Sequence, residues 1–347
     1  MRTETGGMHN TLAPQVEPTS EAAVATLLDI AGGYPLSRCL HVVADLGVAD
    51  VLDETPRTAA ELAAAVGAHP DALGRILCLL SAYDVFVARD GAFAHTAASR
   101  LLRTDHPRSL RAFVRLFGLP PLWASQGDLL HSVRTGRPAG EEVQPGGFWG
   151  YLTEHPEARA VFNAAMSAKA HGHVAGVLAT YDFSEFRTIG DIGGGRGHLL
   201  QAVLDAVPAT RGVLFDLPPV IQEVAGLASE RLTLQAGDFF TDPLPVCDAY
   251  LLMEVIHDWP DAEAIDILGA VRRAAPSGAR LLVIEQMVRD DPGPDWAKTL
   301  DLHMLALLGG RQRSRQEYAA LLQCAGFALL RAIDTGADIA ILETMPM

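Results

Sequence analysis

One stretch decides the fold of this chain: Thr188-Ile-Gly-Asp-Ile-Gly-Gly-Gly-Arg-Gly197, which continues into His198-Leu-Leu-Gln-Ala-Val-Leu204. A short apolar run, a glycine-rich loop and a helical pattern are typical of the first strand, turn and helix of a βαβ unit. Glycine permits a tight turn and a close approach of a ligand to the backbone, and the start of a helix offers free N–H groups. The loop has the form G-x-G-x-G instead of the dinucleotide form G-x-G-x-x-G, so pyrophosphate binding fits poorly.

Short apolar segments alternate with helical ones from Tyr181 onward, which predicts an α/β fold with a Rossmann-like sheet. The expected strands cover residues 188–192, 212–215, 232–235, 249–255, 279–284, 327–334 and 338–343. Thr335-Gly-Ala337 separates the last two strands and predicts a hairpin. The sheet should therefore close with an antiparallel strand.

Residues 20–112 carry a winged-helix pattern, behind an expected disordered tail over residues 1–19. Thr58 and Glu61 form a capping box before one helix, a second helix follows over residues 70–83, and a β-ribbon ends near residue 95. A DNA-binding helix needs basic and amide side chains, whereas this second helix offers only Asp71 and Arg75 and is otherwise apolar. The formal net charge of −15 also argues against DNA binding. The apolar layer favours a homodimer over nucleic-acid binding.

The composition is that of an ordinary globular protein, with 49% hydrophobic residues, and its 347 residues suggest two domains. No apolar stretch approaches the ~18–20 residues of a membrane span, and the first twenty residues lack the pattern of a signal peptide. Four scattered cysteines without metal spacing predict free thiols in the cytoplasm. We therefore expect neither a membrane nor a metal as a partner.

Residues 113–180 are predicted to be a helical connector. Trp149, Phe162 and Met166 fall near helical spacing beside the next domain, so they are candidates for the wall of a substrate pocket. The pair His171 and His173 does not indicate a metal site, because residues two apart on a helix do not face each other.

Polar residues follow successive strands at the edge where open α/β sheets bind their ligands. Asp216 ends the second strand and suits the ribose of NAD or of adenosylmethionine equally. After the third strand, Asp238 can accept from an adenine amino group while Phe239 covers the ring. After the fourth, His257 is a candidate general base near neutral pH.

The ordered motifs together resemble one family. They are Asp191-Ile-Gly-Gly-Gly-Arg-Gly197, Asp216-Leu-Pro218, Gly237-Asp-Phe239, His257-Asp-Trp259 and Gly309-Gly-Arg-Gln-Arg-Ser314. This set resembles the S-adenosylmethionine-dependent O-methyltransferases, both the plant caffeate and flavonoid type and the bacterial polyketide-tailoring type. The resemblance covers nearly the whole chain. It implies a winged-helix dimerisation domain followed by a class I methyltransferase domain over residues 181–347.

The resemblance also implies roles for particular residues. The cofactor S-adenosyl-L-methionine would be bound by Asp191, Gly193, Gly195, Asp216, Leu217, Gly237, Asp238, Phe239 and Met253. The substrate would meet Trp149, Phe162, Met166, Asp258, Asp301, His303 and Met304. His257 would remove the proton of a substrate hydroxyl group, with Glu285 and the residue at position 312 bracketing the imidazole.

Two residues depart from the family pattern. Met253 stands where plant members have a lysine, so a cofactor contact is lost or replaced by Glu254. Gln312 stands in the place of the second bracketing carboxylate. An amide can orient an imidazole but cannot stabilise its positive charge, so we expect His257 to be less basic than it would be between two carboxylates.

The expected activity is methylation of a phenolic or enolic hydroxyl group of an aromatic or polyketide-like secondary metabolite. A phenol of pKa ~10 is mostly protonated at neutral pH, so a base at His257 contributes ~10²–10⁴-fold. Two enzymatic alternatives stay open. One is a hydroxylase or cyclase that binds the same cofactor without transferring its methyl group, and the other is an NAD-dependent oxidoreductase.

Overall fold

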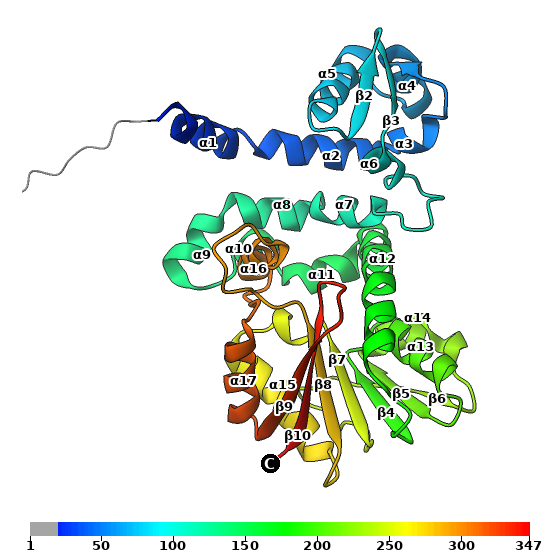
Figure 1. Cartoon of the computed structure of the whole chain (residues 1–347), viewed down its shortest axis with the longest axis vertical. Coiled ribbons are helices and arrows are strands. Elements are labelled where there is room, and N and C mark those ends of the chain that lie inside the picture. Colours follow the sequence, from blue (N-terminus) through cyan, green and yellow to red (C-terminus); the bar gives the residue numbers. More distant parts are fainter. Residues whose placement is uncertain (1–19) are drawn as a thin grey trace, which may run out of the picture.

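The computed structural model describes residues 20–347, so the expected tail over residues 1–19 lies outside the described residues. Figure 1 shows three tiers: an N-terminal helical domain, a middle layer of helices, and an α/β domain that ends the chain. The α/β domain contains the predicted glycine loop and the predicted base.

The α/β domain is built on a seven-stranded sheet with the order β6-β5-β4-β7-β8-β10-β9. The strands are β4 (Thr188–Ile192), β5 (Arg211–Asp216), β6 (Leu232–Ala236), β7 (Ala249–Met253), β8 (Arg280–Glu285), β9 (Phe327–Asp334) and β10 (Ala340–Pro346). The five strands β4 to β8 pair in parallel, whereas β10 is antiparallel to both β8 and β9. The predicted sheet and its antiparallel closing strand are confirmed.

The bounds of β4 and β9 are as predicted, and the ends of the other strands differ by one to three residues. The strand expected over 249–255 ends at Met253, because Glu254 adopts a φ of 54° and a 3-10 turn (η2, Ile256–Asp258) follows. The strand expected over 338–343 starts at Ala340, because Thr335 Oγ1 donates to the carbonyl oxygen of Ile339 and holds a wider loop. His257 therefore lies on a tight turn beyond the strand end.

Helices cover both faces of the sheet (Figure 1). One face packs against α12 (Pro156–Thr180) and α13 (His198–Ala206), with Leu200, Val203 and Val177 fully buried. The other face packs against α15 (Asp261–Ala274) and α17 (Arg315–Cys324). The short helices α14 (Pro218–Glu223) and η1 (Ala225–Leu227) follow β5. Strands buried on both faces explain the continuous apolar runs in the sequence.

The N-terminal domain is the predicted winged helix. Its elements are α1 (Glu21–Ala31), α2 (Tyr34–Leu46), α3 (Val48–Val51), β1 (Arg57–Thr58), α4 (Ala59–Val66), α5 (Pro70–Ser81), β2 (Phe86–Arg89), β3 (Ala92–His95) and α6 (Ala97–Arg100). The Thr58–Glu61 capping box is present, and the three strands pair in the order β1-β3-β2. Over residues 20–347 no single helix is long and apolar enough to cross a membrane; only the bent pair α4–α5 passes that test jointly, by length and composition.

The middle layer consists of short helices joined by the long α12. They are α7 (Arg111–Phe117), α8 (Pro120–Gly127), α9 (Leu129–Thr135), α10 (Ala139–Val143), α11 (Gly147–Glu154) and, from the C-terminal half, α16 (Trp296–Leu307). Residues 136–147 are rich in proline and glycine and contain α10. A side chain at Gly140 would overlap the backbone of Leu307, so glycine lets α10 approach the end of α16.

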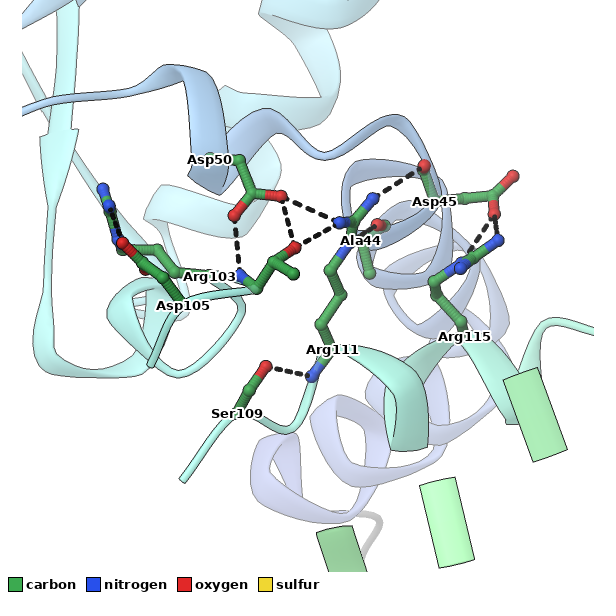
Figure 2. Close-up of polar contacts among 9 residues, drawn as sticks. Ala44, Asp45, Asp50, Arg103, Asp105, Ser109, Arg111 and Arg115 are labelled. Carbon is green, nitrogen blue, oxygen red and sulfur yellow. Dashed lines mark hydrogen bonds and ion pairs between the residues drawn. The ribbon is translucent and has the colours of Figure 1, made fainter. Parts of the chain in front are cut away.

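Two arginines of α7 join the N-terminal domain to the middle layer. Figure 2 shows the Arg111 guanidinium donating to the carbonyl oxygen of Ala44 at 2.7 Å and to the carboxylate of Asp50 at 2.8 Å. Arg115 donates to Asp45 at 2.9 Å in the same view. These contacts anchor α2 and α3 on α7, which packs against α12.

Candidate active site

The glycine loop connects β4 to α13 at the carboxyl edge of the sheet. Gly193, Gly195 and Gly197 have φ values of 66°, 57° and 70°, a region that disfavours other residues. A side chain at Gly194 would overlap the carboxylate of Asp191, whereas one at Gly195 would extend into open space. One side of the loop is therefore packed on the sheet and the other side is open to a ligand.

Two carboxylates lie under this loop. Asp216 accepts from the backbone N–H of Gly195 at 2.8 Å and from that of Leu217 at 2.7 Å. Burial raises the pKa of Asp216, although these two hydrogen bonds oppose the shift. Burial and then the charge of Asp216 raise the pKa of Asp191 to about 7. The pair therefore shares less than two full negative charges near neutral pH.

The ends of three strands converge on the glycine loop. A side chain at Gly193 would lie 3.2 Å from Val255 and 3.6 Å from Phe239. Gly237 passes so close to the ring of Phe215 that a Cβ there would lie 2.7 Å from it. Asp238 accepts from the N–H of Phe240 at 2.9 Å and so closes the turn after β6. The predicted adenosine-binding positions therefore share one edge of the sheet.

His257 is buried, with 6% of its surface exposed, and Glu285 holds it. Glu285 Oε2 lies 2.6 Å from His257 Nδ1, and Glu285 Oε1 accepts from the N–H groups of Ile256 at 2.9 Å and His257 at 3.2 Å. A carboxylate accepts only, so the neutral ring carries its proton on Nδ1 and leaves the Nε2 lone pair free. The predicted partnership of these two residues is present.

A second carboxylate lies at the other ring nitrogen. Asp258 Oδ1 is 3.3 Å from His257 Nε2. Burial lowers the pKa of His257, but the charges of Glu285 and Asp258 outweigh it and raise that pKa to about 10. The expectation of a less basic His257 considered only position 312 and overlooked Asp258, the residue next along the chain.

The loop after α16 supports the turn that carries His257. Arg311 N–H donates to the carbonyl oxygen of His257 at 2.8 Å, and a side chain at Gly310 would overlap that same carbonyl. Arg313, which is 1% exposed, donates to the carbonyl oxygens of Ile256 at 3.2 Å and Trp259 at 2.9 Å. The sequence pattern identified this motif but predicted no role for Gly310 or Arg313.

Gln312 lies between these two anchoring residues. Its side chain is 2% exposed, and its backbone N–H donates to Asp301 Oδ1 at 2.8 Å. Within the described part of the chain, neither Nε2 nor Oε1 of its amide has a hydrogen-bond partner. Its bracketing role on His257 therefore stays a prediction.

Glu254 follows Met253, one of the two residues that differ from the family pattern, and its side chain pairs with residues of α12. Its carboxylate contacts Lys169 and lies 3.4 Å from His173 Nδ1. Burial raises the pKa of Glu254, but Lys169 and then His173 outweigh it and hold that pKa far below its usual range. His171 instead bonds the carbonyl oxygen of Ser167 at 2.6 Å, so the two histidines serve different partners. No signal in the sequence linked position 169 to position 254.

The predicted substrate-binding residues other than Asp258 lie on helices of the middle layer. Phe162 and Met166 pack against one apolar cluster, and the ring centroid of Trp149 lies 5.6 Å from that of Phe162, although Trp149 is 42% exposed. On α16, His303 Nδ1 lies 3.1 Å from Gln126 Nε2, and burial lowers the pKa of His303. Met304 on the same helix is buried.

Comparison with known proteins gives matches over nearly the whole chain. Residues 127–328 match the model of the O-methyltransferase domain, and residues 13–105 match that of the O-methyltransferase dimerisation domain. The phenazine O-methyltransferase of Lysobacter antibioticus is 38% identical over 92% of this chain and 96% of its own length. The mitomycin biosynthesis 6-O-methyltransferase of Streptomyces lavendulae is 40% identical over 91% and 92%. The 8-amino-8-demethylriboflavin N,N-dimethyltransferase of Streptomyces davaonensis is 39% identical over 88% and 90%.

Solved structures of O-methyltransferases also superpose on nearly the whole chain. A mitomycin 7-O-methyltransferase superposes with a TM-score of 0.87 at 38% identity, over 94% of this chain and 98% of that chain. An O-methyltransferase of neocarzinostatin biosynthesis, in complex with S-adenosylmethionine and 2-hydroxy-5-methyl naphthoic acid, superposes with a TM-score of 0.77 at 33% identity, over 90% and 96%.

Proposed function

Because this chain belongs to the O-methyltransferase family, we propose that it uses S-adenosylmethionine to methylate a phenolic or enolic hydroxyl group of an aromatic or polyketide-like metabolite. His257 is the general base in this proposal. The observation that carries it is the buried imidazole whose Nδ1 is held by Glu285 at 2.6 Å, beside the edge that holds the glycine loop.

The residues at the sheet edge fit this cofactor. When bound, S-adenosylmethionine supplies a methyl group on a positively charged sulfur. The open side of Gly195 leaves room for a ligand, and Asp216 offers oxygens that now accept only backbone N–H groups. In the proposal Asp216 holds the ribose, Asp238 and Phe239 hold the adenine, and the remaining contacts come from Asp191, Gly193, Gly195, Leu217, Gly237 and Met253.

The two carboxylates on His257 suit a hydroxyl nucleophile. Methyl transfer to oxygen needs an oxyanion, and a phenol has a pKa of ~10. The pKa of His257, about 10, matches that value, so moving the proton from phenol to imidazole costs little free energy. Glu285 then stabilises the imidazolium that forms and keeps the ring oriented. An amine nucleophile needs no such step, because its lone pair is already free.

The test is a labelled-methyl assay with matched phenols and anilines. We expect S-adenosylhomocysteine and an O-methylated product, and His257→Ala should reduce O-methylation by ~10²–10⁴-fold. Some relatives of this chain are N-methyltransferases, so methylation of anilines that survives in His257→Ala would contradict the assignment of O-methylation. Tight binding of the cofactor with no release of S-adenosylhomocysteine from any substrate would favour the hydroxylase or cyclase alternative.

The same proposal includes a homodimer formed through the N-terminal domain. Helix α1 exposes Leu27, Leu28 and Ile30 at 70%, 67% and 73% of their surface. Exposed apolar faces of this kind mark interfaces in soluble proteins. Light scattering should give a dimer for the wild type and a monomer for the Leu27→Glu, Leu28→Glu double variant, whereas an unchanged mass would exclude α1 from the interface.

A further inference from the structure

The amide of Gln312 is a buried polar group without a partner. Its side chain is 2% exposed, and both Oε1 and Nε2 lack hydrogen bonds within residues 20–347. An unsatisfied buried polar group is costly, and most such groups in proteins are paired. Gln286, the residue after Glu285, has the same defect at Oε1. Unsatisfied groups that persist beside a candidate site point to a ligand that completes them.

The backbone fixes where this amide lies. On one side Arg311 donates to the carbonyl oxygen of His257 at 2.8 Å, and on the other Arg313 donates to that of Ile256 at 3.2 Å. The N–H of Gln312 itself is held by Asp301 on α16 at 2.8 Å. Gln312 therefore lies between the turn that carries the base and the helix that carries His303 and Met304.

The contacts of His257 leave the Gln312 amide no necessary role on the imidazole. Glu285 occupies Nδ1 and Asp258 lies at Nε2, so both ring nitrogens already face carboxylates. No hydrogen bond links Gln312 to His257 in the described residues, and the amide has its full capacity for hydrogen bonding to a third party. An amide both donates and accepts, which matches a hydroxyl group better than it matches a pure donor or a pure acceptor.

We propose that the Gln312 amide selects substrates that carry a second hydroxyl group on the ring carbon next to the hydroxyl that is methylated. The inference rests on the proposed function, since it assumes that His257 receives the proton of the first hydroxyl. Substrates that lack the neighbouring group leave the amide unpaired, and a site built around such a hydrogen bond discriminates strongly against them.

The test compares matched substrates of one, two and three rings: phenol with catechol, 2-naphthol with 2,3-dihydroxynaphthalene, and 2-hydroxyanthraquinone with 1,2-dihydroxyanthraquinone. For the best-accepted pair, the wild type should favour the diol by about 10–100-fold in kcat/KM. Gln312→Leu should reduce the preference to about twofold, the statistical advantage of two hydroxyl groups, mainly by lowering kcat/KM for the diol. Its melting temperature should not fall, because an apolar side chain of similar size removes the unsatisfied amide.

Gln312→Glu is the second variant and separates specificity from an action on the base. If the residue binds substrate, this variant changes the ratio between diol and monohydroxy partner. If it moves the pH–rate profile equally for both partners and leaves their ratio intact, Gln312 acts on His257 and the inference is wrong. A wild type that methylates both partners equally, or a Leu variant that keeps the preference, also overturns the inference alone. No methylation of any of the six compounds by enzyme that binds the cofactor would contradict the proposed function itself.

Discussion

Replacing Asp258 with asparagine should lower the pKa of His257 and so increase the fraction of the imidazole that is neutral, and able to accept a proton, at neutral pH. With a pKa of about 10, only about 0.3% of His257 is neutral at pH 7.5. The Asp258 carboxylate lies 3.3 Å from Nε2, and a pair at that distance interacts by up to about 5 kcal/mol at an effective dielectric constant of ~20. Because Asp258 is partly exposed, we expect solvent to reduce this, so that Asp258→Asn lowers the pKa of His257 by about 1–2 units.

The measurement is the pH dependence of kcat/KM with a fixed substrate. The acidic limb should move down by the same ~1–2 units, and the neutral fraction at pH 7.5 should rise about 10–100-fold. The gain in rate is smaller, since a less basic imidazole transfers the proton less readily. An NMR titration of the His257 ring, assigned by its loss in His257→Gln, measures the same shift directly.

The control is Asp266→Asn, which removes a carboxylate from the exposed face of α15. That variant should leave the acidic limb in place. If Asp258→Asn also leaves both the limb and the NMR titration unmoved, then Asp258 does not determine the charge of His257, and two carboxylates do not set the pKa of this base.

Three further changes test other parts of the site. Glu285→Gln should reduce kcat by ~10²–10⁴-fold and lower the pKa of His257, because it removes the charge at Nδ1; a pH profile like that of the wild type would contradict this. Asp191→Asn should stabilise the fold more at pH 8 than at pH 5, as measured by chemical denaturation. The pKa of Asp191 in the folded protein is raised from 3.8 to about 7, so the stability of the wild type falls as pH rises between these values, by at most about 4 kcal/mol. An equal effect of the substitution at both pH values would refute this reasoning. Gly194→Ala should abolish cofactor binding in calorimetry, because its Cβ would overlap the Asp191 carboxylate, whereas Gly226→Ala, which has open space, should bind normally.

Local patterns predicted much of the architecture. The apolar run of β4 identifies a strand buried on both faces, and its bounds were predicted to the residue. The bounds of the edge strand β9 were also predicted to the residue, although β9 is largely exposed or half-buried. The Thr58–Glu61 capping box depends only on near neighbours and is present where expected. The end of β7 was missed because it depends on Glu254, whose partner Lys169 lies on a distant helix. The two residues are too far apart in the sequence for a local pattern to predict this contact.

Distance along the chain also determines which contacts of the candidate site could be predicted. The family resemblance implied the contact between His257 and Glu285, and topology explains it: Glu285 ends β8, and His257 lies on the turn after the neighbouring parallel strand β7. Asp258 was assigned to the substrate alone, since adjacency along the chain does not reveal that a 3-10 turn brings its carboxylate back to Nε2. Arg313 was overlooked because its carbonyl partners belong to a segment more than fifty residues away.

The charges at the sheet edge argue for a cationic ligand independently of any motif. Asp191, Asp216, Asp258 and Glu285 all lie at the carboxyl ends of β4 to β8, and three of them are largely buried. Within the described chain the cation that faces Asp258 and Glu285 is the imidazolium of His257. Burial, and then repulsion from Asp216, raises the pKa of Asp191 to about 7. A protein that buries uncompensated carboxylates loses stability to them. A positively charged ligand at this edge recovers that free energy, whereas a dinucleotide adds the negative charge of its pyrophosphate. The electrostatics therefore favour a sulfonium over NAD, where the loop spacing alone only disfavoured the pyrophosphate.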